Sequence, residues 1–182
     1  MGAEERLPRV GLLGLTLEFY EQKGSDLREG REQWVRRQVL PALETHAEVL
    51  FPGAVFQRRD VEARVAQFED EDCDAVLVVL LTYSPSQISL PALKRTHLPI
   101  IVWNTQELEG VGEGFSDRLM IENHGVHGTQ DLANVLLRSE VPFSYVTSHV
   151  EDEDGMGELA DFFSAAAAVR RLRQARLGIL GY

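Results

Sequence analysis

The residues with the clearest chemical potential lie in one short stretch, Glu122–Gly128, which holds two histidines three positions apart and two glycines. Glycines at such a place let the backbone approach a ligand closely. A metal pair is one interpretation of His124 and His127. Hydrogen-bonding or packing histidines are the other, and we favour it because no third ligand lies nearby in the sequence. We therefore predict no metal-binding residue in this chain.

Hydroxyl and amide side chains follow two neighbouring apolar segments, 75–81 and 99–103, at the point where each segment ends. Such side chains, with few charges among them, suit the hydrogen-bonding needs of a polyol better than those of a phosphate. A role as strand end and helix cap fits the first group equally well. The candidate binding residues are Thr82, Tyr83, Ser84, Asn104 and Gln106.

Glu18 is the only acid that directly follows a predicted strand at the same edge. A carboxylate there can be imagined as a general base that moves a proton on a substrate. A surface or hydrogen-bonded structural role is the alternative. Glu18 is kept among the candidate substrate-binding residues, and no residue is assigned as catalytic.

The elements that must position these residues alternate along the whole chain. Short apolar runs rich in β-branched residues predict strands, and apolar residues at helical spacing predict helices. The predicted strands cover 9–15, 46–51, 75–81, 99–103 and 143–149. The predicted helices cover about 31–45, 60–70, a segment starting at Ser84, 129–138 and 156–175.

Strands that alternate with helices indicate a parallel sheet covered by helices on both faces. Five such pairs predict an α/β fold of three layers, α/β/α, with a flavodoxin-like doubly wound sheet in the order 2-1-3-4-5. Ligands of such folds bind at the carboxyl ends of the strands, near the point where the strand order reverses. All the candidate residues follow strands or open helices at that edge.

Several local features make sharper predictions. Ser84 and Pro85 fit the N-cap and first position of a helix. Pro41 should kink or divide the helix in which it lies, and Pro91 should keep its helix short or kinked. The polar segment 104–123 reads as a loop, longer than usual, and long loops in compact domains are often functional.

Composition limits the class of protein. The charges sum to −11, which disfavours attraction to nucleic acid or to anionic membranes. The single cysteine, Cys73, excludes an intramolecular disulfide. No apolar run is long enough for a membrane helix, and the first residues lack the pattern of a signal peptide. These features predict a cytoplasmic protein that binds a small neutral ligand or a protein partner.

The last residues suggest a boundary. Residues 1–175 read as one complete domain, whereas 176–182 repeats the glycine-punctuated pattern of the first strand with no helix after it. A parallel strand needs a crossover of a dozen or more residues to gain its next partner. We expect 176–182 to be the first strand of a second, truncated α/β domain.

Together these motifs resemble the N-terminal domain of the L-arabinose and L-fucose isomerase family. The resemblance rests on Thr82–Ser86, Asn104–Gln106, His124–Gly128 and Tyr145–His149, which occur in the family's order over nearly the whole chain. It implies a flavodoxin-like first domain of a larger subunit that interconverts an aldose and a ketose with a divalent metal, commonly manganese. The metal ligands of that family would lie beyond Tyr182, so no cofactor is expected within this chain.

The resemblance also implies a role for His127, which matches a family histidine that reaches toward the active site of a neighbouring subunit. It therefore implies a homo-oligomer, a sugar as ligand and a domain that is inactive alone. Two positions depart from the arabinose isomerases. A family glutamine falls near Leu17 or Glu18, and a family histidine is replaced by Asn104, which leaves the identity of the sugar open.

Two other classes of function stay open at this point. One is a binding module for a sugar or another small ligand that uses the same crevice without chemistry. The other is an electron-transfer domain of flavodoxin-like fold. The bulky, acidic segment Thr16–Tyr20 is unlike the small-residue phosphate loop that such a domain needs after its first strand.

Overall fold

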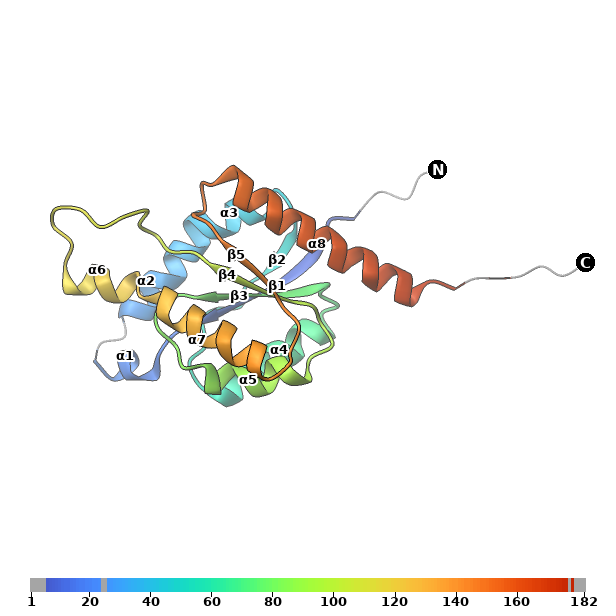
Figure 1. The fold of residues 1–182 in the computed structure, drawn as a ribbon, viewed down its shortest axis with the longest axis horizontal. Helices are drawn as coiled ribbons and strands as arrows, with labels where there is room; N and C mark the ends of the chain where they lie inside the picture. Colours follow the sequence, from blue (N-terminus) through green and yellow to red (C-terminus); the bar gives the residue numbers. More distant parts are fainter. Residues whose placement is uncertain (1–5, 24–25, 177, 179–182) are drawn as a thin grey trace, which may run out of the picture.

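Five parallel strands form the centre of the molecule in a computed structural model that describes residues 6–23, 26–176 and 178 (Figure 1). The strands are β1 (Arg9–Leu15), β2 (Glu48–Leu50), β3 (Ala75–Leu80), β4 (Ile100–Asn104) and β5 (Ser144–Thr147). Their order is β2-β1-β3-β4-β5, which confirms the predicted topology. The register aligns Leu15 of β1 with Leu80 of β3, so the residues after these two strands emerge side by side.

Helical segments connect the strands. They are α1 (Glu18–Lys23), α2 (Asp26–Trp34), the π-helical turn η1 (Val35–Val39), α3 (Leu40–Leu43), α4 (Arg58–Asp70), α5 (Ser86–Arg95), α6 (Asp117–Glu122), α7 (Gly125–Arg138) and α8 (Glu153–Gln174). None of these described helices combines the length and the apolar character needed to cross a bilayer.

The sheet is buried on both faces, which explains why its strands are continuously apolar rather than alternating. Leu12 and Leu77 point to one face, where they pack with side chains of α2, η1, α3 and α8. Leu13 and Val78 point to the other face, toward α4, α5 and α7. Figure 1 shows these two helical layers on either side of the sheet. The predicted three-layer α/β/α fold is confirmed.

The interruption predicted at Pro41 takes the form of a π-helical turn that precedes the proline. The N–H of Leu40 donates to the carbonyl of Val35, five residues back. A proline ring clashes with the carbonyl four residues earlier in a regular α-helix. The wider π turn relieves that clash, so helical backbone continues from Asp26 to Leu43 without a break.

The predicted cap of α5 is wrong. The helix begins at Ser86, and its N-cap is Pro85 in an extended conformation, with φ −65° and ψ 134°. The carboxylate of Asp131, on α7, accepts a hydrogen bond of 3.0 Å from the backbone N–H of Ser86. A side chain 45 residues away thus performs the capping that the sequence assigned to Ser84. As predicted, the helix that contains Pro91 is short, with 10 residues.

Two boundaries near the candidate site differ from the prediction. The segment 104–123 is not loop throughout, because it contains α6, whose N-cap Ser116 accepts a hydrogen bond from Leu119. Helix α7 begins at Gly125 rather than Thr129, which places His127 in its first turn. Of the predicted strand at 176–182, the structure describes Arg176 and Gly178 alone, so that prediction lies outside the described residues.

Candidate functional site

Three ring side chains gather at the carboxyl end of β3. The ring of His124 lies 4.4 Å from that of His127 and 6.1 Å from that of Tyr83, measured between centroids. Tyr83 belongs to the loop after β3, His124 is the N-cap of α7, and His127 is exposed in the first turn of this helix. The structure therefore brings three of the candidate residues into one cluster, the Tyr83–His124–His127 cluster.

Two glycines allow this cluster to form. A Cβ atom on Gly125 would lie 2.2 Å from the carbonyl oxygen of Leu80, and one on Gly128 would lie 2.3 Å from the Leu80 side chain. The first turn of α7 therefore rests directly on the end of β3, at a distance that larger residues would prevent. The glycines beside the histidines serve close helix packing, and this packing sets where both imidazoles stand.

The cluster favours neutral imidazole at His124. Partial burial lowers the pKa of His124 below its ordinary value of 6.5, and repulsion from His127 lowers it further. The N-terminal end of α7 acts in the same direction, because its partial positive charge disfavours a second positive charge. A neutral imidazole has one donor and one acceptor nitrogen, which suits the hydroxyl of a sugar.

The serine and threonine residues that follow β3 are more deeply buried than the Tyr83–His124–His127 cluster. Thr82 is fully buried, and its hydroxyl donates to the carbonyl of Tyr83 at 3.1 Å. Ser84 is 2% exposed, and its hydroxyl oxygen has no hydrogen-bond partner among the described residues. Thr16, Ser86 and Thr105 likewise carry buried hydroxyl oxygens without a described partner. They follow β1, β3 and β4, so the described buried hydroxyl oxygens without a partner collect at this one edge of the sheet.

Asn104 and Gln106 line a separate hollow of about 260 Å³ beside the cluster, at the ends of β4 and β5. Asn104 donates to the hydroxyl of Thr147 at 3.3 Å, and the side-chain amide of Gln106 donates to the carbonyl of Leu108 at 3.1 Å. Val126 of α7 forms part of the wall. This hollow, the β4–β5 pocket, is therefore contiguous with the helix that carries His127.

Glu18 stands apart from these groups. It begins α1 after β1, is exposed, and its carboxylate accepts a hydrogen bond of 2.9 Å from the side chain of Gln57. Gln57 is the N-cap residue of α4, which follows β2. The described contacts of Glu18 thus tie it to the β2 side of the sheet rather than to the histidines.

Arg31 is an important residue that our sequence reasoning missed. Its side chain is 5% exposed on α2 and forms ion pairs with Glu107, after β4, and with Glu122, at the end of α6. It also donates to the carbonyl of Glu122 at 3.3 Å. A detectable signal was its position three residues before Trp34 on the buried face of the helix. Arg31 fastens both ends of the segment that leads to His124.

One group of described residues could hold a cation: Glu109, His149 and Glu151, whose ligand atoms lie within 4.8 Å of one another. Our sequence reasoning did not find this group either, because Glu109 and His149 are far apart in the chain. His149 and Glu109 also line the β4–β5 pocket.

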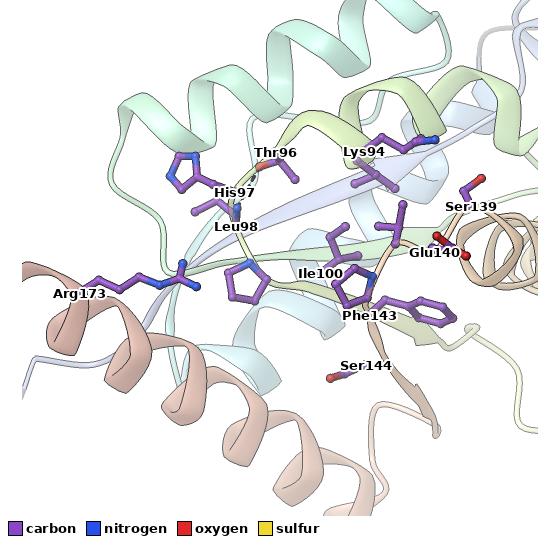
Figure 2. A pocket seen from close by; sticks show the side chains of 14 residues that line it. Lys94, Thr96, His97, Leu98, Ile100, Ser139, Glu140, Phe143, Ser144 and Arg173 are labelled. Carbon is purple, nitrogen blue, oxygen red and sulfur yellow. Dashed lines mark hydrogen bonds between the residues drawn. The ribbon is translucent and has the colours of Figure 1, made fainter.

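A larger hollow, of about 570 Å³, lies at the opposite edge of the sheet (Figure 2). Its walls come from the end of α5, the start of β4 and the turn between α7 and β5, with Arg173 of α8 at one side. Much of its lining is apolar, including Leu98, Ile100 and Phe143. None of the candidate residues lines it, and in open parallel sheets ligands bind at the other edge.

Fold and site together define a doubly wound α/β domain with a histidine-bearing polar surface at the carboxyl edge of its sheet. The sequence matches the family described as "Fucose/sulfoquinovose isomerase, N-terminal domain" over residues 32–173. The chain belongs to this family, which confirms the resemblance drawn from the motifs.

Individual relatives agree with this assignment. An L-arabinose isomerase of Aeromonas hydrophila is 28% identical over 113 residues, which cover 60% of this chain and 23% of the relative. That of Bacillus subtilis is 22% identical over 91% of this chain and 32% of its own length. A sulfoquinovose isomerase of Alkalicoccus urumqiensis is 21% identical over 59% of this chain and 23% of its own. The chain thus spans between about a fifth and a third of the relatives' lengths.

Proposed function

We propose that this chain is the N-terminal domain of a metal-dependent isomerase that interconverts an aldose and a ketose sugar. In this proposal the domain holds the substrate and does not react with it. Family membership supports the class of enzyme, and the names of the relatives support a sugar as the substrate. The observation that carries the site is the Tyr83–His124–His127 cluster at the carboxyl edge.

His127 would make the principal contact to the sugar. It is exposed, stands in the first turn of a 14-residue helix, and lies beside a half-buried histidine whose pKa is lowered. The imidazole can orient a hydroxyl group by donating or accepting one hydrogen bond. Tyr83 and His124 would support it, and Asn104 and Gln106 would extend the polar surface into the β4–β5 pocket.

The reaction requires groups that we place elsewhere in the enzyme. Isomerisation needs a base to move a proton and a metal ion to polarise the carbonyl group. We propose that the base and the metal ion belong to the region of the full-length enzyme that corresponds to the unmatched part of the relatives. This domain would therefore be inactive alone. Because the cluster is an open surface, it would close over a sugar only when a neighbouring subunit covers it. The complete enzyme would then be a cytoplasmic homo-oligomer.

Steady-state kinetics of the full-length protein tests this proposal. Loss of one hydrogen bond to a positioned substrate costs about 1 to 2 kcal/mol, so His127→Ala should lower kcat/KM roughly tenfold or more. The melting temperature should stay the same, because His127 is exposed. His97→Ala is the matched control, since His97 is exposed at the opposite edge of the sheet and should leave the kinetics unchanged. Unchanged kinetics, or a large loss of stability, in His127→Ala would contradict the proposed role.

A further inference from the structure

We propose that Glu109, His149 and Glu151 form a binding site for one divalent cation of the zinc type, which joins the loop after β4 to the loop after β5. The site goes beyond the proposed sugar contacts and does not depend on them. The three side chains come from two loops that are far apart in the chain but adjacent at the edge of the sheet.

The hydrogen bonds of His149 place its ring proton on Nε2 and leave the electron pair on Nδ1, the nitrogen near the two acids. Its Nε2 lies 3.3 Å from the carbonyl oxygen of Glu107, which can only accept, so Nε2 carries the proton. Its Nδ1 receives the backbone N–H of Glu151 at 3.3 Å, which requires a lone pair on Nδ1. The two contacts together select the neutral Nε2–H tautomer. Metal-binding histidines are typically oriented in this way, by a carbonyl or carboxylate on their second nitrogen.

This lone pair faces negative charge. Nδ1 lies 3.8 Å from a carboxylate oxygen of Glu109, and Glu151 contributes another carboxylate oxygen to the same group. An electron pair beside two carboxylates is unfavourable unless a cation lies between them. The backbone contact to Nδ1 is at the long end for a hydrogen bond and leaves the lone pair weakly engaged.

The spacing suits a small divalent cation. One imidazole nitrogen and two carboxylate oxygens are ligands that zinc accepts at about 2.0 to 2.2 Å, which puts tetrahedral ligands about 3.4 Å apart. The His149 Nδ1–Glu109 distance is 3.8 Å and all three ligand atoms lie within 4.8 Å of one another, so rotations of the two exposed acids, Glu109 and Glu151, would bring the set to this spacing. Three protein ligands leave at least one coordination position open.

The open position would face a polar cavity. Glu109 and His149 line the β4–β5 pocket together with Thr105, which is 6% exposed and has a hydroxyl oxygen without a described partner. This buried, unsatisfied oxygen is a second and independent sign that the pocket receives a polar ligand.

Both loops are held in place before any cation binds. Ser148, which precedes His149, donates its backbone N–H to Asn104 at 3.2 Å and accepts a hydrogen bond of 2.9 Å from the indole of Trp103. On the other loop, the carboxylate of Glu107 pairs with the buried Arg31. The backbone of both loops is therefore ordered before a cation binds, which lowers the entropy lost on binding.

Calorimetric titration of the 182-residue chain with Zn²⁺ tests the proposal. We expect one equivalent to bind saturably, and we expect His149→Gln and Glu109→Gln each to weaken the affinity about tenfold or more. Glu109→Gln changes an exposed side chain, so it decides the matter even if His149→Gln fails to fold. The matched control is His97→Gln, which removes an exposed histidine that pairs with Glu69 at the opposite edge of the sheet, and this variant should bind as tightly as the unaltered chain.

The same experiment tests a second possible zinc site. His124 and His127 could bind zinc as a pair, so His127→Gln is titrated in parallel. Retained binding in His127→Gln together with loss in Glu109→Gln supports the proposal. Absence of saturable binding, binding unaffected by Glu109→Gln, or loss of binding in His127→Gln would overturn it.

Discussion

Single side chains at the carboxyl edge derive their properties from what lies beneath them. His124 and His127 stand where they do because Gly125 and Gly128 let the helix touch the end of β3. Burial and the neighbouring imidazole then lower the pKa of His124. Packing thus favours the neutral form of His124, and a neutral imidazole suits hydrogen bonds to hydroxyl groups better than contacts to anions.

The pKa of His124 is a residue-scale prediction. An NMR titration of the imidazole signals should give a pKa below 6.5, and His127→Gln should move it part of the way back, because burial remains. Folded protein binds fewer protons at His124 than unfolded chain does, so this contribution to stability is present above pH 6.5 and declines as the pH falls through the lowered pKa. A value at or above 6.5 in the unaltered chain would show that the imidazole is not buried as described.

Among the elements, the segment between β4 and α7 is anchored to α2 by several ion pairs. It carries α6 and leads to His124. The buried side chain of Arg31 pairs with Glu107 and Glu122. The exposed side chain of Arg118 pairs with Asp26 at 2.6 Å and with Glu122 at 2.8 Å. The two arginines share Glu122 but differ in burial.

This difference in burial predicts that substituting the two arginines lowers the free energy of unfolding by different amounts. Arg31→Met leaves Glu107 without its described partner in a partly buried setting, although Glu122 keeps Arg118, and it should destabilise the chain by about 3 kcal/mol. Arg118→Met removes an arginine whose side chain is 54% exposed, and it should cost less than about 1 kcal/mol. Denaturant unfolding of both variants measures the comparison. Equal losses would mean that burial of Arg31 does not govern the anchoring of this segment.

The sequence predicted the elements better than their contacts. Apolar runs predicted five strands and their order correctly, because a sheet buried on both faces leaves an unmistakable local pattern. The cap of α5 was mispredicted because Asp131, 45 residues away, performs it. Arg31 and the Glu109–His149–Glu151 group were missed for the same reason. Their partners meet only when distant segments fold together, and the one local signal, the position of Arg31 on the buried face of α2, does not identify those partners.

At the scale of the whole molecule, the two edges of the sheet differ. The candidate histidines, amides and unsatisfied hydroxyls gather at the carboxyl edge, whereas the large hollow at the amino edge has a mixed polar and apolar lining that includes none of them (Figure 2). The matched segments of this chain cover only 23% of one L-arabinose isomerase and 32% of another. Under the proposed function, the carboxyl edge would form one side of an active site whose other side comes from the parts of the enzyme that this chain does not match.

In the proposed enzyme, His127 of one subunit would serve the active site of its neighbour. The most direct measurement mixes two full-length variants in one oligomer, His127→Ala and a variant that retains His127 but lacks a metal ligand elsewhere in the enzyme. The 182-residue chain alone, supplied with Mn²⁺, serves as the blank and should show no turnover.

We expect the mixed oligomers to isomerise sugar faster than the average of the two parent variants, because the second variant contributes its intact His127 to a metal site of the first. Sugar turnover equal to that average would rule out a shared site, since each active site would then use only the residues of its own subunit.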